Sequence, residues 1–511
     1  MEAWERILAV MLTAPCPRQE FLPGMYAARW GRVVNVASVH GLVASPFKSA
    51  YVAAKHGLVG LTKTIALEAA ARCPDVTAHA ICPTYGGTRA CGLDDDRRRL
   101  HDGRGLAGAL TPVGSAPMGS YRYLVVGGGM TGDSACRGIR DHDRDGTIGL
   151  VGAEPHAPYA RPPLSKGLWK GKPEDSIFRG TAELDVELHL GRRIVALDLA
   201  GRTATDDAGT THEYEKLLLA TGGEPRRLPD AVDDVVYFRT LDHYRRLREV
   251  AGEGARIAVI GGGFIGSELA AALASEGCAT AILFPEHGIG ALLFPTELSA
   301  FVSDYYRSQG VEVLPGELVA SVTRQGDELR VATDSGRELA ADAVVAGLGI
   351  RPSTALAEEA GLQVDDGVLV DAYGRVQGHE DVFAAGDVAR FPLPALGGTR
   401  RVEHEDHANS HGHAVGANMA GADEPYDHLP FFYSDLFDLG YEAVGDVDSR
   451  LATLAEWAEP NRKGVVAYVD EALRPHGFLL WDVWGKVDAA RELIRAGEPV
   501  EAETLRSLFG E

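Results

Sequence analysis

The amino-acid sequence predicts an α/β fold, because short apolar strands alternate with helical patterns along most of its 511 residues. The strongest signals are YLVVGGGMTGD, which starts at Tyr123, and RIAVIGGGFIGSE, which starts at Arg256. In each segment an apolar strand runs directly into a glycine-rich turn, and a helical pattern follows. We therefore expect two Rossmann-like dinucleotide-binding domains in one chain.

The first glycine-rich turn contains Gly127, Gly129 and Gly132 in the spacing GxGxxG. The first glycine permits a tight turn, the second lets the backbone approach a pyrophosphate, and the third lets the helix pack closely on the strand. The helix N-terminus then faces the phosphates. An acidic residue about 20 positions further on should bind a ribose hydroxyl, and Glu154 closes the next strand.

The second turn repeats this pattern with Gly261, Gly263 and Gly266, and Glu286 closes the strand that follows. An acid at this place favours NADH, because it would repel the 2′-phosphate of NADPH. Two such turns, each followed by an acid at the right distance, indicate two dinucleotides. The natural pair is FAD and NADH.

Two further strand ends could contact a flavin. LLLATGGEP holds Thr221 and Gly222, and DVFAAGDVARFP holds Gly386 and Asp387. An acid that follows a glycine at a strand end could accept a hydrogen bond from the ribityl chain of FAD. The alternative for Asp387 is a cap on the next helix.

Composition narrows the classes of function. The net charge of −23 argues against nucleic acid or an anionic membrane surface as partner. Six scattered cysteines without a CxxC pair argue against a thiol–disulfide centre and fit a reducing cytoplasm. No apolar run approaches the ~20 residues of a membrane helix. The first residues, MEAWERILAVMLTAP, carry an acid before their apolar stretch, so we expect no signal peptide.

Several other segments are distinctive: PYARPPLSKGLW (158–169), AILFPE (281–286), VFAAGDVA (382–389), RRVEHEDHA (400–408) and FFYSDLFDLGYEAVG (431–445). Together with the C-terminal KGVVAYVDEALRPHGFLLWDVWGKVDAARELI, they resemble the apoptosis-inducing-factor family of FAD/NADH reductases, from about residue 121 to 511. This family is kin to the oxygenase-coupled ferredoxin reductases. The resemblance implies an FAD-binding domain in two segments (121–240 and 351–426), an inserted NADH-binding domain (241–350) and an α+β C-terminal interface domain (427–511).

The resemblance also implies roles for residues near the flavin. Lys166 and Glu268 would form an ion pair beside the flavin ring, and His404 would stack by it. Tyr433 stands where the family carries an aromatic residue, and Arg161 belongs to the matched flavin-binding segment. From the residues alone, Lys166 could equally be a solvated lysine, and Glu268 an exposed acid in the first turn of a helix.

Two positions depart from the family. The second histidine after VEH is Glu405 here, and the aromatic of the FWSDL-type stretch is Tyr433 rather than tryptophan. Both changes could alter how the flavin is shielded. In the same run, His407 and His411 stand at a spacing that could suit a metal, but no third ligand is found, so we predict no metal site.

The first 92 residues resemble short-chain dehydrogenases of the 3-hydroxybutyrate type. Ser38, Tyr51 and Lys55 stand at that family's spacing, in which the lysine lowers the pKa of the tyrosine. However, the fragment lacks the family's glycine-rich loop, and Met11 replaces its catalytic asparagine. We therefore expect an incomplete Rossmann fragment (1–92) without activity, followed by a linker (93–120) rich in glycine and charge.

These observations predict an FAD-dependent NADH:acceptor oxidoreductase. NADH would pass a hydride to the flavin N5, and electrons would go to an external acceptor, because no cysteine pair can relay them. The acceptor could be ferredoxin, a quinone or oxygen. The first alternative is an NADH-responsive flavin protein that turns over slowly and signals through a conformational or homodimer change. The second is a hydroxy acid dehydrogenase formed by the N-terminal fragment.

Overall fold

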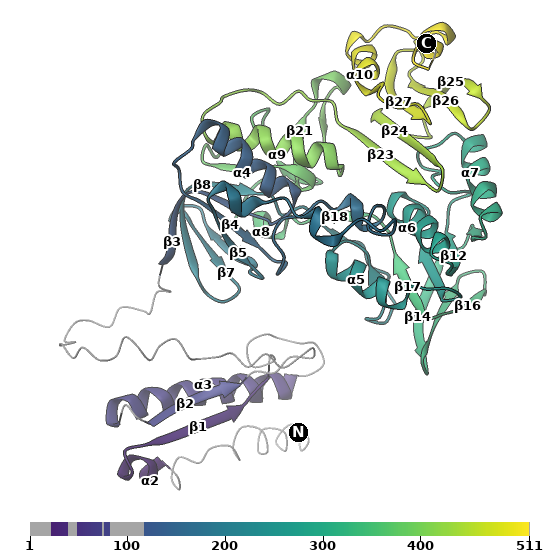
Figure 1. The fold of residues 1–511 in the computed structure, drawn as a ribbon. Coiled ribbons are helices and arrows are strands. Elements are labelled where there is room, and N and C mark those ends of the chain that lie inside the picture. Colours follow the sequence, from purple (N-terminus) through teal and green to yellow (C-terminus); the bar gives the residue numbers. More distant parts are fainter. Residues whose placement is uncertain (1–21, 39–48, 74–75, 82–116, 510–511) are drawn as a thin grey trace. The chain divides into compact units, whose positions relative to one another are not determined.

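The structure is a computed structural model that describes residues 22–38, 49–73, 76–81 and 117–509. The chain separates into two compact units, Met1–Thr111 and Pro112–Glu511 (Figure 1). Position 11 and residues 93–116 of the predicted linker lie outside the described residues. Within the described chain, no helix is both long and apolar enough to span a membrane.

The N-terminal unit is a two-stranded parallel sheet with a long helix. Ile65 and Ala69 lie one turn apart on α3 and are fully buried. They share a core cluster with Leu22 of α2 and Val33 of β1. The residue patterns of 31–38 and 76–83 predict strands and that of 49–70 predicts a helix, and the structure confirms all three. The elements are α2 (Leu22–Ala27), β1 (Gly31–Val36), α3 (Ser49–Arg72) and β2 (Val76–Ile81).

The first dinucleotide-binding domain is built on a sheet with the strand order β5-β4-β3-β8-β7-β6, and β20 joins it beside β8. Strands β3, β8 and β20 are parallel neighbours, so their carboxyl ends meet at one edge of the sheet. This edge brings together three turns that are distant in sequence. The strands of the sheet are β3 (Pro117–Val126), β4 (Ile148–Gly152), β5 (Val186–Leu190), β6 (Ile194–Asp198), β7 (Thr203–Asp206), β8 (Thr211–Leu219) and β20 (Val382–Ala384).

Helices α4 and α9 cover this sheet and touch each other through glycines. A Cβ atom on Gly138 would collide with the carbonyl oxygen of His413, and one on Gly416 would collide with that of Ala135. The two backbones therefore approach closely, which fixes the start of α9 relative to the first glycine-rich turn. The helices and short strands of this part are α4 (Met130–His142), α8 (Ala355–Glu359), α9 (Glu405–Met419), β19 (Val368–Leu369), β21 (Ala389–Pro392) and β22 (Thr399–Arg400), with 3₁₀ turns η4 (Pro162–Leu164), η5 (Glu174–Ile177), η6 (Thr181–Leu184), η7 (Gly386–Val388) and η8 (Pro394–Leu396).

The predicted linker end at residue 120 is wrong, because β3 already begins at Pro117. Its first residues continue the parallel pairing with β8, from Pro117↔Thr211 to Tyr121↔Tyr214. Proline and glycine in SAPMGS are typical of a linker. At the first position of a strand, however, a proline is tolerated.

The second dinucleotide-binding domain has a five-stranded parallel sheet in the order β10-β17-β11-β12-β13. The predicted domain start at residue 241 is too late, because β10 (Val236–Tyr237) pairs with β17 in this sheet. A two-residue strand carries no periodic pattern that the sequence could reveal. The other elements are α5 (Leu241–Val250), β11 (Arg256–Ile260), α6 (Phe264–Ser275), β12 (Ala279–Phe284), α7 (Thr296–Ser308), β13 (Glu312–Pro315), β14 (Val319–Gln325), β15 (Glu328–Thr333), β16 (Glu338–Ala341) and β17 (Ala343–Ala346).

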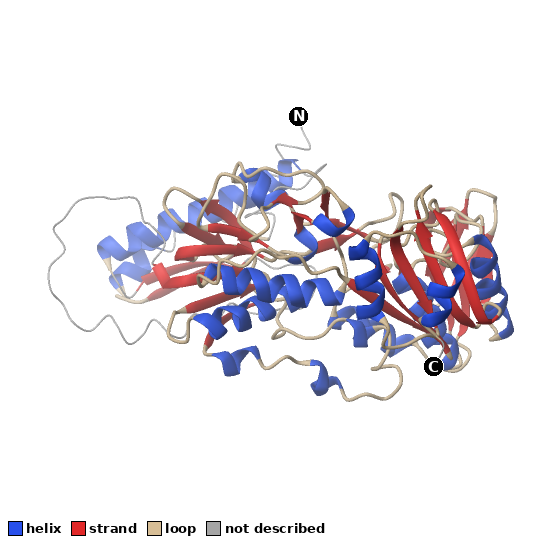
Figure 2. Cartoon of the chain, turned by 90° about the horizontal axis from the view of Figure 1, so that it is seen from above, coloured by secondary structure: helices blue, strands red, loops and turns tan. Residues whose placement is uncertain are grey.

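A two-stranded antiparallel ribbon, β9 (Gly223–Pro225) with β18 (Ile350–Pro352), carries the chain between these domains. The C-terminal domain is a five-stranded antiparallel sheet in the order β23-β24-β27-β26-β25, seen in Figure 2 as a layer of strands with helices against it. The residue patterns of 463–470 and 476–485 predict strands and that of 487–497 predicts a helix, and the structure confirms all three. Its elements are β23 (Phe431–Leu436), β24 (Leu439–Gly445), β25 (Ala452–Glu459), β26 (Lys463–Val469), β27 (Pro475–Trp481), α10 (Val487–Ala496) and α11 (Ala502–Ser507).

Candidate functional site

One continuous cavity of about 1750 Å³ connects the two glycine-rich turns. Its lining comes from both dinucleotide-binding domains and from β23 of the C-terminal domain. Apart from Gly132 and Gly266, which lie behind the turns, and Gly386, every residue predicted for the two dinucleotide sites lines it. A cavity of this size between the ends of parallel strands is large enough to hold more than one cofactor-sized ligand.

The first glycine-rich turn forms a cradle open to this cavity. Gly127 has φ of +133°, a conformation that favours glycine, and a Cβ atom there would collide with the carbonyl oxygen of Ala220. A Cβ atom on Gly132 would collide with the carbonyl oxygen of Gly127. By contrast, nothing lies within 4 Å of the Cβ position of Gly129, which precedes α4. The backbone at the helix N-terminus is therefore exposed to a phosphate group, as the pyrophosphate of a dinucleotide requires.

The second turn has the same construction. Gly261 has φ of +110° and faces the carbonyl oxygen of Gly347, while Gly266 packs on the carbonyl oxygen of Gly261. Nothing lies within 4 Å of the Cβ position of Gly263, at the start of α6. Both turns thus fit the pyrophosphate of a dinucleotide.

The two strand-end acids differ in their surroundings. Glu154 accepts hydrogen bonds from Arg161 Nη2 at 2.6 Å and from the Tyr159 hydroxyl at 2.5 Å. Arg161 also donates to the carbonyl oxygen of Arg239 at 2.6 Å. Glu286 lines the cavity half-buried, and within the described chain its carboxylate has no hydrogen-bond or ion-pair partner.

The turn after β20 places Asp387 in the first domain's part of the cavity. Its carboxylate pairs with Arg239 at 3.0 Å and lies inside the 3₁₀ turn η7, so it does not cap a following helix. The backbone N–H of Gly386 donates to Nδ1 of the buried His411 at 3.3 Å, which orders this turn. Gly222, at the end of β8, has φ of +65°, and the neighbouring Thr221 hydroxyl donates to the Ser353 carbonyl oxygen at 3.0 Å.

A buried ion pair lies at the meeting point of the three domains. Lys166 Nζ is 3.0 Å from Oε1 of Glu268, and their side chains are only 9% and 5% exposed. Ser434 donates to the same oxygen at 2.6 Å, and Ser165 donates to Oε2 at 2.6 Å. Lys166 is therefore not a solvated lysine, and Glu268 is not an exposed acid. Because Glu268 is on α6, Lys166 follows η4 and Ser434 is on β23, one carboxylate joins all three domains.

Aromatic rings flank this ion pair. The Lys166 ammonium lies 3.9 Å from the ring centroid of Tyr433, a cation–π contact, and donates to its carbonyl oxygen at 3.2 Å. His404 stacks on Phe432 with centroids 4.2 Å apart, and Phe264 meets both rings edge-on. Burial lowers the pKa of His404 to about 4, so its imidazole is neutral near pH 7.

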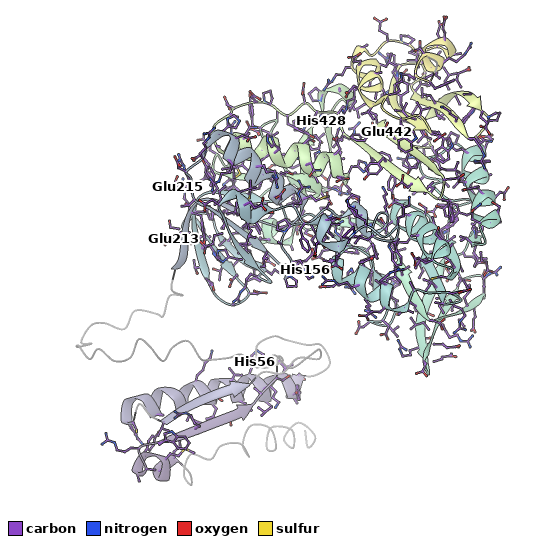
Figure 3. The ribbon with its side chains drawn as sticks, in the orientation of Figure 1. His56, His156, Glu213, Glu215, His428 and Glu442 are labelled. Carbon is purple, nitrogen blue, oxygen red and sulfur yellow. The ribbon has the colours of Figure 1, made fainter. Side chains whose placement is uncertain are left out.

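The first turn of α9 is anchored to the C-terminal domain. Asp406 accepts hydrogen bonds from Nε2 of His428 (labelled in Figure 3) at 2.6 Å, from Arg491 at 3.3 Å and from the backbone N–H of Phe431 at 3.2 Å. These contacts hold β23 against α9. They bring Tyr433 to Glu405, whose Oε2 lies 3.4 Å from the Tyr433 hydroxyl.

Sequence reasoning missed three contributors: Ser165, Ser434 and Glu405. The serines stand inside motifs that were singled out for other residues, and Glu405 was noted only as a departure from a family pattern. The sequence showed that these residues lie within the motifs RPPLSK, FYSDL and VEHE, but it did not indicate a chemical role for them.

The histidines of α9 take part in packing. His407 and His411 are buried. The His407 ring stacks on the rings of Phe391 and His411, and the His411 ring also contacts Phe391. Burial lowers the pKa of both histidines, that of His411 to about 3. Among the described residues, no cluster of His, Cys, Asp and Glu could hold a metal ion.

In the N-terminal unit, Tyr51 and Lys55 lie one turn apart on α3, and Ser38 is buried after β1. Lys55 Nζ donates to the carbonyl oxygen of Val36 at 2.9 Å and is 5.7 Å from the Tyr51 ring centroid. The site role of these three residues stays a prediction.

Comparison with known protein families agrees with this architecture. The pyridine nucleotide-disulphide oxidoreductase model matches residues 121–412, the short chain dehydrogenase model matches residues 1–96, and the C-terminal domain model of mitochondrion-associated apoptosis-inducing factor matches residues 415–463. The chain therefore belongs to the pyridine nucleotide-disulphide oxidoreductase family. It is an FAD-dependent NAD(P)H oxidoreductase, which confirms the predicted cofactors and class of enzyme.

Individual relatives extend over most of the chain. Mitochondrial apoptosis-inducing factor 1 of Dictyostelium discoideum is 32% identical, and the match covers 75% of this chain and 79% of that protein. The ferredoxin–NAD(+) reductase component of an anthranilate 1,2-dioxygenase system of Burkholderia cepacia is 35% identical over 64% of this chain and 82% of its own. Monodehydroascorbate reductase 3 of Arabidopsis thaliana is 32% identical over 64% of this chain and 81% of its own.

Among solved structures, a covalent putidaredoxin reductase–putidaredoxin complex aligns with a TM-score of 0.71 and 26% identity, over 78% of this chain and 100% of that chain. The ferredoxin reductase of the CYP199A2 system of Rhodopseudomonas palustris aligns with a TM-score of 0.70 and 28% identity, over 75% of this chain and 97% of that chain. These similarities confirm the α/β fold.

Proposed function

We propose that the protein is an NADH:acceptor oxidoreductase in which NADH passes a hydride to flavin N5 and an external acceptor then takes the electrons. The observation that carries this proposal is the single cavity that joins both glycine cradles past the Lys166–Glu268 pair. When bound, FAD supplies a carrier that accepts two electrons as hydride and can release them singly or as a pair.

The buried ion pair has a chemical role in this proposal. Lys166 places a positive charge at the wall of the cavity, where it stabilises negative charge that develops on a ligand. Glu268 keeps that ammonium in place, and the hydroxyls of Ser165 and Ser434 keep Glu268 itself in place. The lysine is thus fixed before the reaction, so no reorganisation is needed during it.

The choice of NADH over NADPH rests on Glu286. Its carboxylate lines the cavity at the end of β12, without a cationic partner in the described chain. A 2′-phosphate placed there would meet an unshielded negative charge, whereas a ribose hydroxyl could donate a hydrogen bond to it.

An external acceptor fits the cysteines that the structure describes. Cys73, Cys136 and Cys278 are buried and unpaired, and burial raises the pKa of the Cys136 and Cys278 thiols. Cys136 and Cys278, which belong to the same unit as the cavity, do not line it, so neither is placed to relay electrons from it.

Anaerobic titration of the yellow holoenzyme with NADH tests the proposal. We expect stoichiometric bleaching of the flavin absorbance, followed by reoxidation when an acceptor such as ferricyanide is added. Protein that retains FAD but is not bleached by NADH would contradict the proposal. Ferredoxin, quinone and oxygen can then be compared as acceptors by their rates of reoxidation.

The same titration tests a second candidate, an NADH-responsive signalling protein with slow turnover. The three-domain contacts of Glu268 favour it, because they could transmit a change in the cavity to the C-terminal domain. Slow reduction together with a change of oligomeric state on NADH addition would support this candidate over the reductase.

A further inference from the structure

Two residues that depart from the family pattern touch each other at the cavity wall. The Tyr433 hydroxyl lies 3.4 Å from Oε2 of Glu405, and both side chains line the cavity beside Lys166. Glu405 opens α9 and Tyr433 lies on β23. The anchor of Asp406 to Phe431 holds these two elements together, so the contact belongs to the folded frame of the site.

The Glu405 carboxyl group forms no ion pair within the described chain. Four other carboxyl groups of the cavity lining each pair with a cation: Glu268 with Lys166 at 3.0 Å, Asp387 with Arg239 at 3.0 Å, Glu403 with Arg401 at 2.6 Å, and Asp406 with Arg491 at 3.3 Å. Without a cationic partner, a carboxyl group holds its proton more readily than the same group would in an ion pair.

The charged groups that face Glu405 act in opposite directions. Lys166, Arg179 and the Tyr433 hydroxyl favour the carboxylate, while Asp406 and burial favour the protonated acid. Burial is the largest of these effects, so the pKa of Glu405 is raised above its usual range. The neighbouring His404 is neutral near pH 7 and has no such proton to give.

We infer that Glu405 donates a proton to an organic acceptor bound in this cavity, and that the acceptor is a quinone-type molecule. The Tyr433 hydroxyl positions the carboxyl group through its hydrogen bond. This inference rests on the proposed function, because the electrons come from NADH through the bound flavin.

The reaction balances with this donor. NADH loses a hydride, which is two electrons and one proton, and becomes NAD⁺. A quinone needs two electrons and two protons to form the two O–H bonds of a hydroquinone. The second proton comes from the Glu405 carboxyl group, which becomes a carboxylate and regains a proton from water that enters the cavity. An iron–sulfur acceptor takes electrons only and has no use for this donor.

The test compares two acceptors in the full-length holoenzyme and its Glu405→Gln variant. Menadione takes up electrons with protons, whereas ferricyanide takes up electrons alone. We expect the ratio of menadione turnover to ferricyanide turnover to fall about tenfold or more in E405Q, and Glu405→Asp to recover most of it. In the unchanged protein, menadione turnover should fall as pH rises through the pKa of Glu405, and E405Q should lack this limb.

Tyr433→Phe gives an independent measurement, because it removes only the hydroxyl. We expect its turnover ratio to fall about threefold, the effect of one hydrogen bond. Unchanged ratios in both E405Q and Y433F would overturn the inference. So would a holoenzyme that NADH bleaches normally but that does not reduce menadione, and this result would leave the proposed function intact. A bound flavin that NADH cannot bleach would instead overturn the proposed function.

Discussion

The two dinucleotide sites share one backbone plan but differ in their charges. In the first site, the acid Glu154 is already bound by Arg161 and Tyr159, and Asp387 by Arg239. In the second site, Glu286 faces the cavity without a partner in the described chain. A site whose polar groups are already held in place loses little conformational freedom on binding, which suits a cofactor that stays bound. An acid without a partner can instead form its hydrogen bond anew with each ligand that binds, which suits a ligand that exchanges. This difference supports the proposal that FAD binds at the first site and an exchangeable NADH at the second.

The largest expected effect is a loss of cofactor binding when a Cβ atom is added inside one glycine-rich turn at a time. Gly132→Ala puts a Cβ atom against the carbonyl oxygen of Gly127, and Gly266→Ala puts one against that of Gly261. We expect G132A to lose most of its FAD, because the first turn must distort. G266A should keep its yellow colour and bind NADH at least about tenfold more weakly.

The ratio of flavin to protein and an anaerobic NADH titration measure these two losses. Gly252→Ala is the matched control, because its Cβ position is open, its φ is not positive and it lies outside the cavity lining. If G266A lost FAD as completely as G132A, the assignment of one cofactor to each cradle would be wrong.

Substitution of Glu268, the residue that joins the two sites, should give the next largest effect, a slower reduction of the flavin. Glu268→Gln keeps the shape of the side chain but leaves Lys166 without its counter-charge in a buried place. We expect flavin reduction by NADH to slow about 10- to 100-fold, measured in a stopped-flow instrument. Lys166→Gln should show a similar loss, and the double variant should be no slower than either, because the pair acts as a unit. Fully additive losses would show that the two residues act separately.

Local sequence patterns predicted the parts of these sites that depend on short-range geometry. The glycines and the strand-end acids are fixed by the link between strand, turn and helix, so their positions could be read from the sequence. The hydrogen bonds that hold Glu268 could not be predicted from the sequence, because Ser165 and Ser434 come from segments that only tertiary folding brings together. The same holds for β10, two residues long, and for the contact of Glu405 with Tyr433. Sequence identifies which residues a cradle needs, but not which partners neutralise its acids.

Substitutions of the two strand-end acids, Glu286 and Glu154, should have smaller effects that differ from each other. Glu286→Ser removes the charge that disfavours a 2′-phosphate, so the ratio of NADPH to NADH turnover should rise about tenfold. Glu154→Gln should leave that ratio unchanged and instead weaken FAD retention, because Arg161 loses its carboxylate. Initial rates with both nucleotides and dialysis of the flavin measure the two effects. A changed nucleotide ratio in E154Q would remove the distinction between the sites.

The smallest expected effect is a loss of folding stability at acid pH, and it should be larger for the domain of the first site than for that of the second. Burial lowers the pKa of His404 to about 4 and that of His411 to about 3, and both belong to the first domain. Between these values and about 6.5, the usual pKa of an exposed histidine, the unfolded chain binds more protons than the folded one. The stabilisation is therefore complete above pH 6.5 and is lost as pH falls, toward 4 for His404 and toward 3 for His411.

We expect the urea midpoint of flavin release to decrease from pH 7 to pH 5, and to decrease less in His411→Gln. Glutamine can still accept the hydrogen bond from Gly386 but cannot take up a proton. His287 beside Glu286 is exposed, so His287→Gln, the matched control in the second site, should follow the unchanged protein at both pH values. If H411Q showed the same decrease as H287Q, the buried histidines would not be the source of the acid sensitivity of the first site.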